Sequence, residues 1–123
     1  MSSVARKIML VDDNIISMMV TDEVLTSHGY RVSKTTSPNG CIAKVEYEEP
    51  DVLLVDVEMS RLAIDDLFSS LVNNDEHPDL IVVIFSNMEP AELEKLCQKK
   101  DAHGYFSKSM DVTRLPEYID YFF

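Results

Sequence analysis

Residues 80–85 read Leu-Ile-Val-Val-Ile-Phe, six apolar side chains in a row that end at Ser86. A strand with one face in water would alternate apolar and polar residues, so an unbroken run favours a strand covered on both faces. Val52–Val55 is a second run of this kind, and it lies between Asp51 and Asp56. The two runs together predict a parallel sheet with helices on both sides.

Weaker strand candidates and helix-like stretches surround these two runs. Three further strands are expected at Ile8–Val11, Tyr30–Thr35 and Tyr105–Phe106, and the last two are expected near the sheet edges. Between the strands the apolar residues change to helical spacing. Five helices are expected: over residues 16–24 with a stop at His28-Gly29, between Asn39 and Glu48, around Asp65–Leu71, from Pro90 to about Lys100, and over Leu115–Phe122. The alternation predicts one α/β domain over residues 1–123 with right-handed crossovers.

Helical spacing also predicts which residues of two helices contact the core. In the first helix these are Ile16, Val20 and Val24 with Met19 beside them, and in the last they are Leu115, Tyr118, Ile119 and Phe122. Tyr121 and Phe123 fall outside the last set. They are expected either to pack partly at a frayed terminus or to belong to an apolar surface patch.

Composition limits the function classes. The 123 residues are 46% hydrophobic, which suffices for a core, and 22 acidic against 11 basic side chains give a net charge of −11. Such a charge repels nucleic acids and anionic membrane surfaces, so neither is an expected partner. No apolar run approaches the length of a membrane span and no signal peptide is visible, so a cytoplasmic location is expected. The cysteines and histidines show no metal-ligand spacing.

Polar residues at the carboxyl ends of the predicted strands are the candidate site, because ligands of open parallel sheets bind there. They are Asp12, Asp13, Asp56, Ser86 and Lys108. Each alone has an ordinary structural explanation, such as a helix cap or a solvated lysine. Their shared placement favours function, since three neighbouring carboxylates need a cation, and Mg²⁺ suits them. With Lys108 available to pair with a phosphoryl group, the set predicts phosphoryl chemistry.

Four segments within this pattern carry a family resemblance. Residues 9–14 (MLVDDN), 53–59 (LLVDVEM), 84–86 (IFS) and 104–108 (GYFSK) resemble the signature of CheY-like receiver domains of two-component response regulators. The resemblance covers essentially the whole chain. It implies a flavodoxin-like doubly wound sheet of five parallel strands in the order 2-1-3-4-5, with helices on both faces.

The resemblance also implies a role for each candidate residue. Asp56 corresponds to the phosphoacceptor, and Lys108 to the lysine that pairs with the incoming phosphoryl group. Ser86 corresponds to the switch hydroxyl and Tyr105 to the switch aromatic. The implied Mg²⁺ ligands are Asp12, Asp13, Asp56 and the backbone carbonyl of Glu58.

Partners follow from the same resemblance. A sensor histidine kinase or a phosphotransfer protein would donate the phosphoryl group, and a stand-alone receiver would signal by binding a downstream protein. The face of the fourth and fifth helices, near Tyr121 and Phe123, is a candidate surface for that target. A monomer or weak homodimer is expected, and no catalysis beyond the chain's own phosphorylation and dephosphorylation.

Three residues depart from the family pattern. Ser109 stands where receivers usually have a proline after a cis peptide bond, so either this loop accepts a cis bond before serine or Lys108 is held differently. Ser60 replaces a usual proline and Ile64 a typical glycine, so the loop after Asp56 is expected to differ in shape. These departures leave open a degenerate receiver that docks partners without phosphorylation. An aspartyl phosphohydrolase is the weaker alternative, because residues 12–14 do not form its D-x-D motif.

Overall fold

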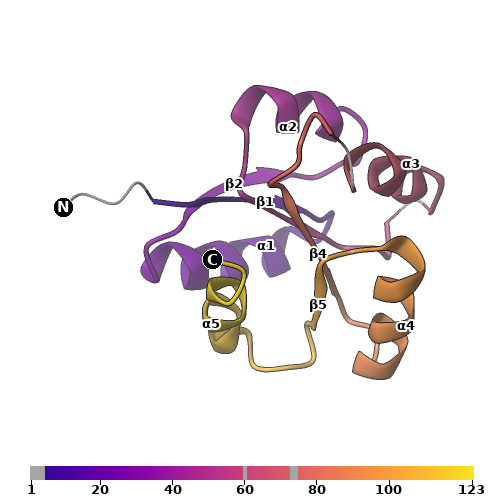
Figure 1. The fold of residues 1–123 in the computed structure, drawn as a ribbon. Helices are drawn as coiled ribbons and strands as arrows, with labels where there is room; N and C mark the ends of the chain where they lie inside the picture. The colour runs from indigo at the N-terminus through magenta and orange to yellow at the C-terminus, as the bar shows by residue number, and fades with distance from the viewer. Residues whose placement is uncertain (1–4, 60, 73–74) are drawn as a thin grey trace.

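Five parallel strands form one sheet at the centre of the computed structural model, which describes residues 5–59, 61–72 and 75–123 (Figure 1). The strands are β1 (Lys7–Val11), β2 (Arg31–Thr35), β3 (Val52–Val55), β4 (Ile81–Ser86) and β5 (Gly104–Ser107). Their order is β2-β1-β3-β4-β5, which confirms the expected topology and the edge positions of β2 and β5. Ser60, for which an altered loop is expected, lies outside the described residues.

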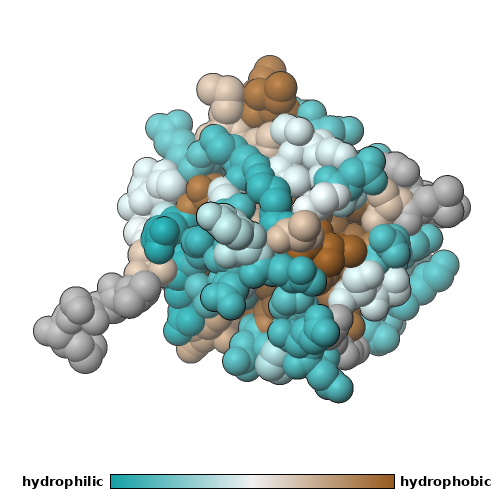
Figure 2. Space-filling model, turned by 90° about the horizontal axis from the view of Figure 1, so that it is seen from above, coloured by the Kyte–Doolittle hydropathy of each residue, from teal (hydrophilic) through white to brown (hydrophobic). Residues whose placement is uncertain are grey.

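Helices cover both faces of the sheet (Figure 1), and the side of the molecule seen in Figure 2 is mostly hydrophilic with smaller hydrophobic areas. They are α1 (Ile15–Ser27), α2 (Cys41–Glu48), α3 (Arg61–Leu71), α4 (Pro90–Lys100) and α5 (Leu115–Asp120), with a 3₁₀ turn at Val112–Arg114 before α5. Each lies close to its predicted position. None of the helices in the described part of the chain is both long and apolar enough to cross a bilayer.

The unbroken apolar strands divide their side chains between two cores. Toward α2, α3 and α4 point Met9, Val11, Leu53, Val55, Val82 and Ile84. Toward α1 and α5 point Ile8, Leu10, Val52, Leu54, Val83 and Phe85. Because the central strands are buried on both faces, consecutive residues must all be apolar, which is why these runs predict the parallel sheet correctly.

The predicted core face of α1 is wrong. Ile16, Met19 and Val20 are 75%, 61% and 47% exposed, whereas the helix buries Met18, Thr21 and Leu25. Apolar residues occur all around this helix, so their spacing does not select a face. Thr21 is tolerated inside because its hydroxyl donates a hydrogen bond to the Ser17 carbonyl at 2.8 Å.

The predicted core face of α5 is confirmed at its centre. Leu115 and Ile119 are fully buried, and Tyr118 and Phe122 are partly buried against the same core. The helix ends at Asp120, so Phe122 lies beyond it. Gly104 leaves room for this aromatic pair, since a Cβ there would overlap the Tyr118 hydroxyl and come within 2.9 Å of Phe122.

Candidate functional site

Backbone hydrogen bonds beyond the strand ends bring the predicted site residues to one edge of the sheet. The Asp56 amide donates to the Val11 carbonyl at 2.8 Å, which holds the residue after β3 beside the end of β1. The Lys108 amide donates to the Ser86 carbonyl at 2.7 Å, which holds the residue after β5 beside the end of β4. The carboxyl ends of four strands are therefore fixed side by side.

Lys108 joins two buried carboxylates at this edge. Its Nζ lies 2.6 Å from Asp12 Oδ2 and 3.2 Å from Asp56 Oδ2. The side chains of all three residues are at least nine-tenths buried, and the ammonium also lies 5.3 Å from the centre of the Phe85 ring. One cation thus reduces the repulsion between two acids that share a poorly hydrated space.

Asp13 completes an acidic group with Asp12 and Asp56. One carboxylate oxygen from each lies within 4.8 Å of the others, and Asp13, unlike its neighbours, is exposed to solvent. The helix-cap explanation for this pair does not hold, because Asn14 caps α1 by accepting a hydrogen bond from the Ser17 amide at 3.0 Å. Asp12 Oδ1 instead accepts from the Asn14 amide at 2.9 Å, which orients the carboxylate.

Burial raises the pKa of the Asp56 carboxyl above its ordinary value of 3.8, and the nearby charge of Asp12 acts in the same direction. The hydrogen bond from the Glu58 amide to Asp56 Oδ1, at 2.9 Å, and the charge of Lys108 oppose this increase. The ionised form of Asp56 therefore depends on the groups around it, and a further cation would favour it.

The donor set fits Mg²⁺. Three carboxylates face one ammonium, so the group keeps an excess of negative charge even with Lys108 in place. Oxygen ligands of this type, with one carboxylate open to water, are the donors that Mg²⁺ prefers. Glu58 is the remaining predicted ligand. The hydrogen bond that its backbone amide donates to Asp56 Oδ1 keeps its backbone beside the group.

Serine residues hold the loop after β5. The Ser107 hydroxyl donates to the Met88 carbonyl at 2.8 Å and lies 2.7 Å from the Ser109 hydroxyl. No cis peptide bond occurs among the described residues, so the bond between Lys108 and Ser109 is trans. Of the two expectations for this loop, the cis bond before serine is therefore wrong, and Lys108 reaches Asp12 and Asp56 across a trans bond.

Ser86 and Tyr105 lie on the neighbouring strands. Ser86 is fully buried at the end of β4, and its Oγ accepts a hydrogen bond from the Met88 amide at 3.4 Å. Tyr105 is half-buried on β5 against the core that faces α2, α3 and α4. Within the described ranges, no hydrogen bond joins either side chain to Asp12 or Asp56. The acidic group and Lys108 thus come together directly, whereas Ser86 and Tyr105 lie on the two neighbouring strands without a hydrogen bond to Asp12 or Asp56 in the described ranges.

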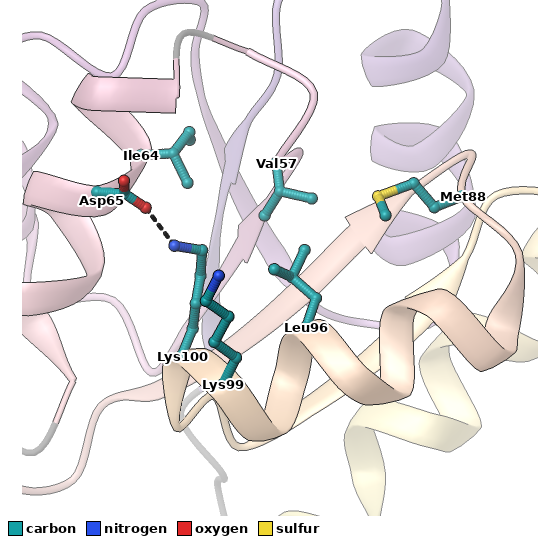
Figure 3. Close-up of a pocket in the computed structure, with 7 residues that line it drawn as sticks. All are labelled: Val57, Ile64, Asp65, Met88, Leu96, Lys99 and Lys100. Atoms are coloured by element: carbon teal, nitrogen blue, oxygen red, sulfur yellow. Dashed lines mark hydrogen bonds and ion pairs between the residues drawn. The ribbon is translucent and has the colours of Figure 1, made fainter.

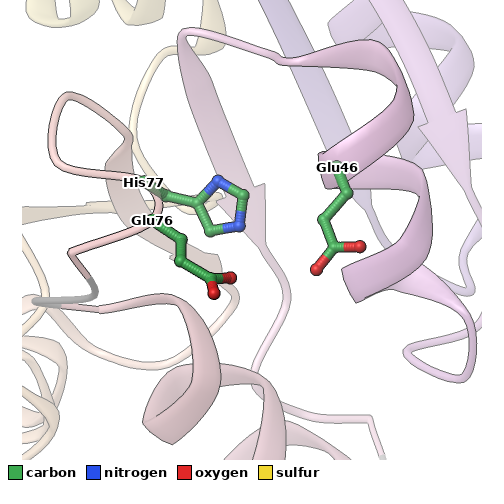
Figure 4. A group of neighbouring side chains, drawn as sticks. All are labelled: Glu46, Glu76 and His77. Carbon is green, nitrogen blue, oxygen red and sulfur yellow. The ribbon is translucent and has the colours of Figure 1, made fainter.

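A second group of ionisable side chains was not expected from sequence spacing. Glu46 of α2 faces Glu76 and His77 of the segment before β4, with ligand atoms within 4.8 Å of one another (Figure 4). Thirty residues separate Glu46 from Glu76, so only the fold brings them together. The two carboxylates are exposed, so water competes with them for any ion. Proximity alone therefore does not assign an ion to this group.

Comparison with protein families gives one match over almost the whole chain. Residues 8–120 match the model of the response regulator receiver domain. The chain belongs to this family. Receiver domains act as signalling switches in two-component systems rather than as classical enzymes, and phosphorylation and Mg²⁺ bound at an acidic pocket are typical of them.

Individual relatives agree with this assignment. The chain is 28% identical to the protein PilH of Pseudomonas aeruginosa over 115 residues, which cover 93% of this chain and 94% of PilH. It is 21% identical to the chemotaxis protein CheY of Thermotoga maritima, over 94% and 95% of the two chains. The crystal structure of a putative response regulator from Chloroflexus aurantiacus has the same fold, with a TM-score of 0.86, 17% identity, and coverage of 97% of this chain and 98% of that one.

Proposed function

We propose that this receiver domain accepts a phosphoryl group on Asp56 from a histidine kinase or a phosphotransfer protein, with Mg²⁺ present, and signals by binding a protein target. The observation that carries the proposal is the ion pair of Lys108 with both Asp12 and Asp56 at the carboxyl edge of the sheet. An isolated surface lysine would not be nine-tenths buried between two acids.

Each residue has a separate task in this proposal. Asp56 is the nucleophile, oriented by the Glu58 amide on one oxygen and by Lys108 on the other. Asp12, Asp13, Asp56 and the Glu58 carbonyl would hold Mg²⁺, which supplies positive charge for the phosphoryl oxygens when bound. Lys108 pairs with the same phosphoryl group, so its ammonium must shift from the carboxylates toward the new anion.

Ser86 and Tyr105 would transmit the change. Among the described residues, the hydrogen bond that the Ser86 hydroxyl makes is the long one it accepts from the Met88 amide, so the hydroxyl is available to donate to a phosphoryl oxygen. A shift of Ser86 toward the phosphoryl group would alter the loop that contains Met88, and with it the packing of the half-buried Tyr105. The face of α4 and α5 remains the proposed target surface, with Tyr121, which is 89% exposed, as its apolar contact. Phe123 is engaged elsewhere, because the Arg6 guanidinium stacks on its ring at 3.8 Å.

The docking-only alternative rests on the departures from the family pattern. Ser109 no longer supports it strongly, because Lys108 reaches both carboxylates across a trans peptide bond. The hydrolase alternative loses support because receiver domains are switches rather than classical enzymes.

Incubation with acetyl phosphate tests the proposal, with the phosphorylated fraction measured on a phosphate-affinity gel. We expect a slower-migrating species that needs Mg²⁺, disappears in Asp56→Asn, and persists in the matched control Asp66→Asn on the exposed side of α3. A folded protein that stays unmodified in Mg²⁺ would favour the docking-only alternative. Modification that persists in Asp56→Asn would exclude Asp56 as the acceptor.

A further inference from the structure

A pocket of about 380 Å³ lies between α3 and α4, and residues of the loops that follow β3 and β4 also line it (Figure 3). Its lining residues are Val57, Ile64, Asp65, Met88, Leu96, Lys99 and Lys100. Figure 3 shows the apolar side chains of Val57, Ile64, Met88 and Leu96 directed toward a common space, with both lysine side chains extending from α4 at one end.

The apolar part of the pocket is built by side chains from α3, α4 and the loop after β4. Ile64 is buried and supplies the wall on the α3 side, at the position where the family resemblance predicts glycine. Leu96 supplies the opposite wall from α4, and Met88 closes one end. Apolar walls of this kind favour an apolar ligand body, because binding removes both surfaces from water.

The lysine end of the pocket is cationic. Lys100 pairs with Asp65 and lies 5.7 Å from the centre of the Phe68 ring, so its charge is largely engaged. For Lys99 the described part of the chain contains no ion pair. Among the residues that line this pocket, two ammonium groups face one carboxylate, on a protein whose total charge is −11.

Volume and charge together select the ligand class. Pockets for small molecules span roughly 300–1,000 Å³, and this one lies at the lower end of that range. An apolar body next to an unpaired cation calls for an anion at one end of the ligand. We propose that the pocket binds a small amphipathic anion, with its apolar part between Ile64, Met88 and Leu96 and its negative group at Lys99.

Binding here should be coupled to the acidic site, a consequence that rests on the proposed function. Val57 directly follows Asp56, and Met88 is hydrogen-bonded through its amide to Ser86 Oγ and through its carbonyl to Ser107 Oγ. A ligand packed on Met88 therefore favours one arrangement of the loop that phosphorylation would move. Coupling between two sites is reciprocal, so phosphorylation must change the ligand's affinity by the same factor.

The test uses decanoate as the probe, below its micelle concentration, with protein labelled with ¹³C in the methionine methyl groups. We expect a saturable shift of the Met88 signal, assigned with Met88→Leu. The signals of Met19 and Met110 should stay in place, because they are exposed at other surfaces and report nonspecific binding. Lys99→Gln should weaken binding about three-fold, as expected for a solvent-accessible ion pair, while Lys95→Gln on the exposed side of α4 should not.

Three outcomes overturn the site: no shift of Met88, equal shifts at Met19 and Met110, or equal affinity in Lys99→Gln and the unsubstituted chain. Decanol, which matches the probe without its charge, should bind more weakly than decanoate, and equal binding would contradict the anion requirement. Titration after treatment with acetyl phosphate tests the coupling. If Asp56 accepts no phosphoryl group, the Met88 shift still decides the binding claim, so the two failures are distinguishable.

Discussion

Replacing Lys108 with methionine should expose the electrostatic stress at the acidic edge. Methionine keeps much of the apolar stem beside Phe85 but removes the ammonium that lies 2.6 Å from Asp12 and 3.2 Å from Asp56. Removing one partner of a buried ion pair costs about 3–5 kcal/mol, because the remaining charge is left unpaired. Asp13 is exposed, so water already screens the third carboxylate. We therefore expect a loss of about 3 kcal/mol, near the lower limit.

Mg²⁺ should reverse most of this loss. At about 100 times its dissociation constant, a ligand that binds only the folded state adds about 2.7 kcal/mol. The assay is urea unfolding followed by circular dichroism, in EDTA and in saturating MgCl₂, for the unsubstituted chain, Lys108→Met and the double variant Lys108→Met/Asp56→Asn. In EDTA the double variant should be more stable than Lys108→Met, because it carries one fewer unpaired buried charge.

A loss below about 1 kcal/mol for Lys108→Met in EDTA would mean that the pair behaves as a surface ion pair and would exclude this electrostatic role. Destabilisation of the Lys108→Met background by Asp56→Asn would exclude it too, since Asp56 would then be well accommodated without its cation.

Three further changes test separate parts of the structure. The pKa of Asp56 is raised in the folded state, so its ionisation opposes folding, and stability that is present below the unfolded-state pKa is lost as pH rises through the folded value. In EDTA, the stability of Asp56→Asn relative to the unsubstituted chain, measured by urea unfolding, should therefore increase as pH rises above the ordinary carboxyl value of 3.8, and a difference that stays constant with pH would contradict the shift. Gly104→Ala should cost about 1–3 kcal/mol, measured by urea unfolding, because its Cβ overlaps the Tyr118 hydroxyl; unchanged stability would show that the aromatic pair moves freely. Asn14→Ala should lower the free energy of unfolding by about 0.5–2 kcal/mol, because the α1 cap is lost, whereas Asn39→Ala on an exposed loop should lower it little. Equal effects in urea unfolding would show that the Asn14 cap does not stabilise α1.

The parallel sheet and the carboxyl-end site could be predicted from sequence because each rests on a local pattern with a strong physical cause. A run such as Val52–Val55 is apolar throughout because both of its faces are buried. The acids after β1 and β3 had to meet, because parallel strands end at the same edge. The order itself came from the family resemblance rather than from composition or spacing.

Other features depend on the whole fold and left no local signal. The core face of α1 was mispredicted because apolar residues occur on all its sides, and only packing selects Met18 and Leu25 over Ile16. The trans peptide before Ser109 is the form expected before any residue other than proline, whereas the hydroxyl contact between Ser107 and Ser109 is not visible in sequence spacing. The meeting of Glu46 with His77 joins α2 to the segment before β4.

In the function proposed above, the residues gathered at the carboxyl edge serve to phosphorylate Asp56. The most direct measurement is peptide mapping after treatment with acetyl phosphate and Mg²⁺, followed by borohydride reduction, which converts an acyl phosphate into a stable alcohol identifiable by mass spectrometry. We expect that the reduced residue is Asp56, that Asp12 and Asp13 are unchanged, and that omission of Mg²⁺ abolishes the product. Reduction at another carboxylate, or none in a folded protein that binds Mg²⁺, would contradict it.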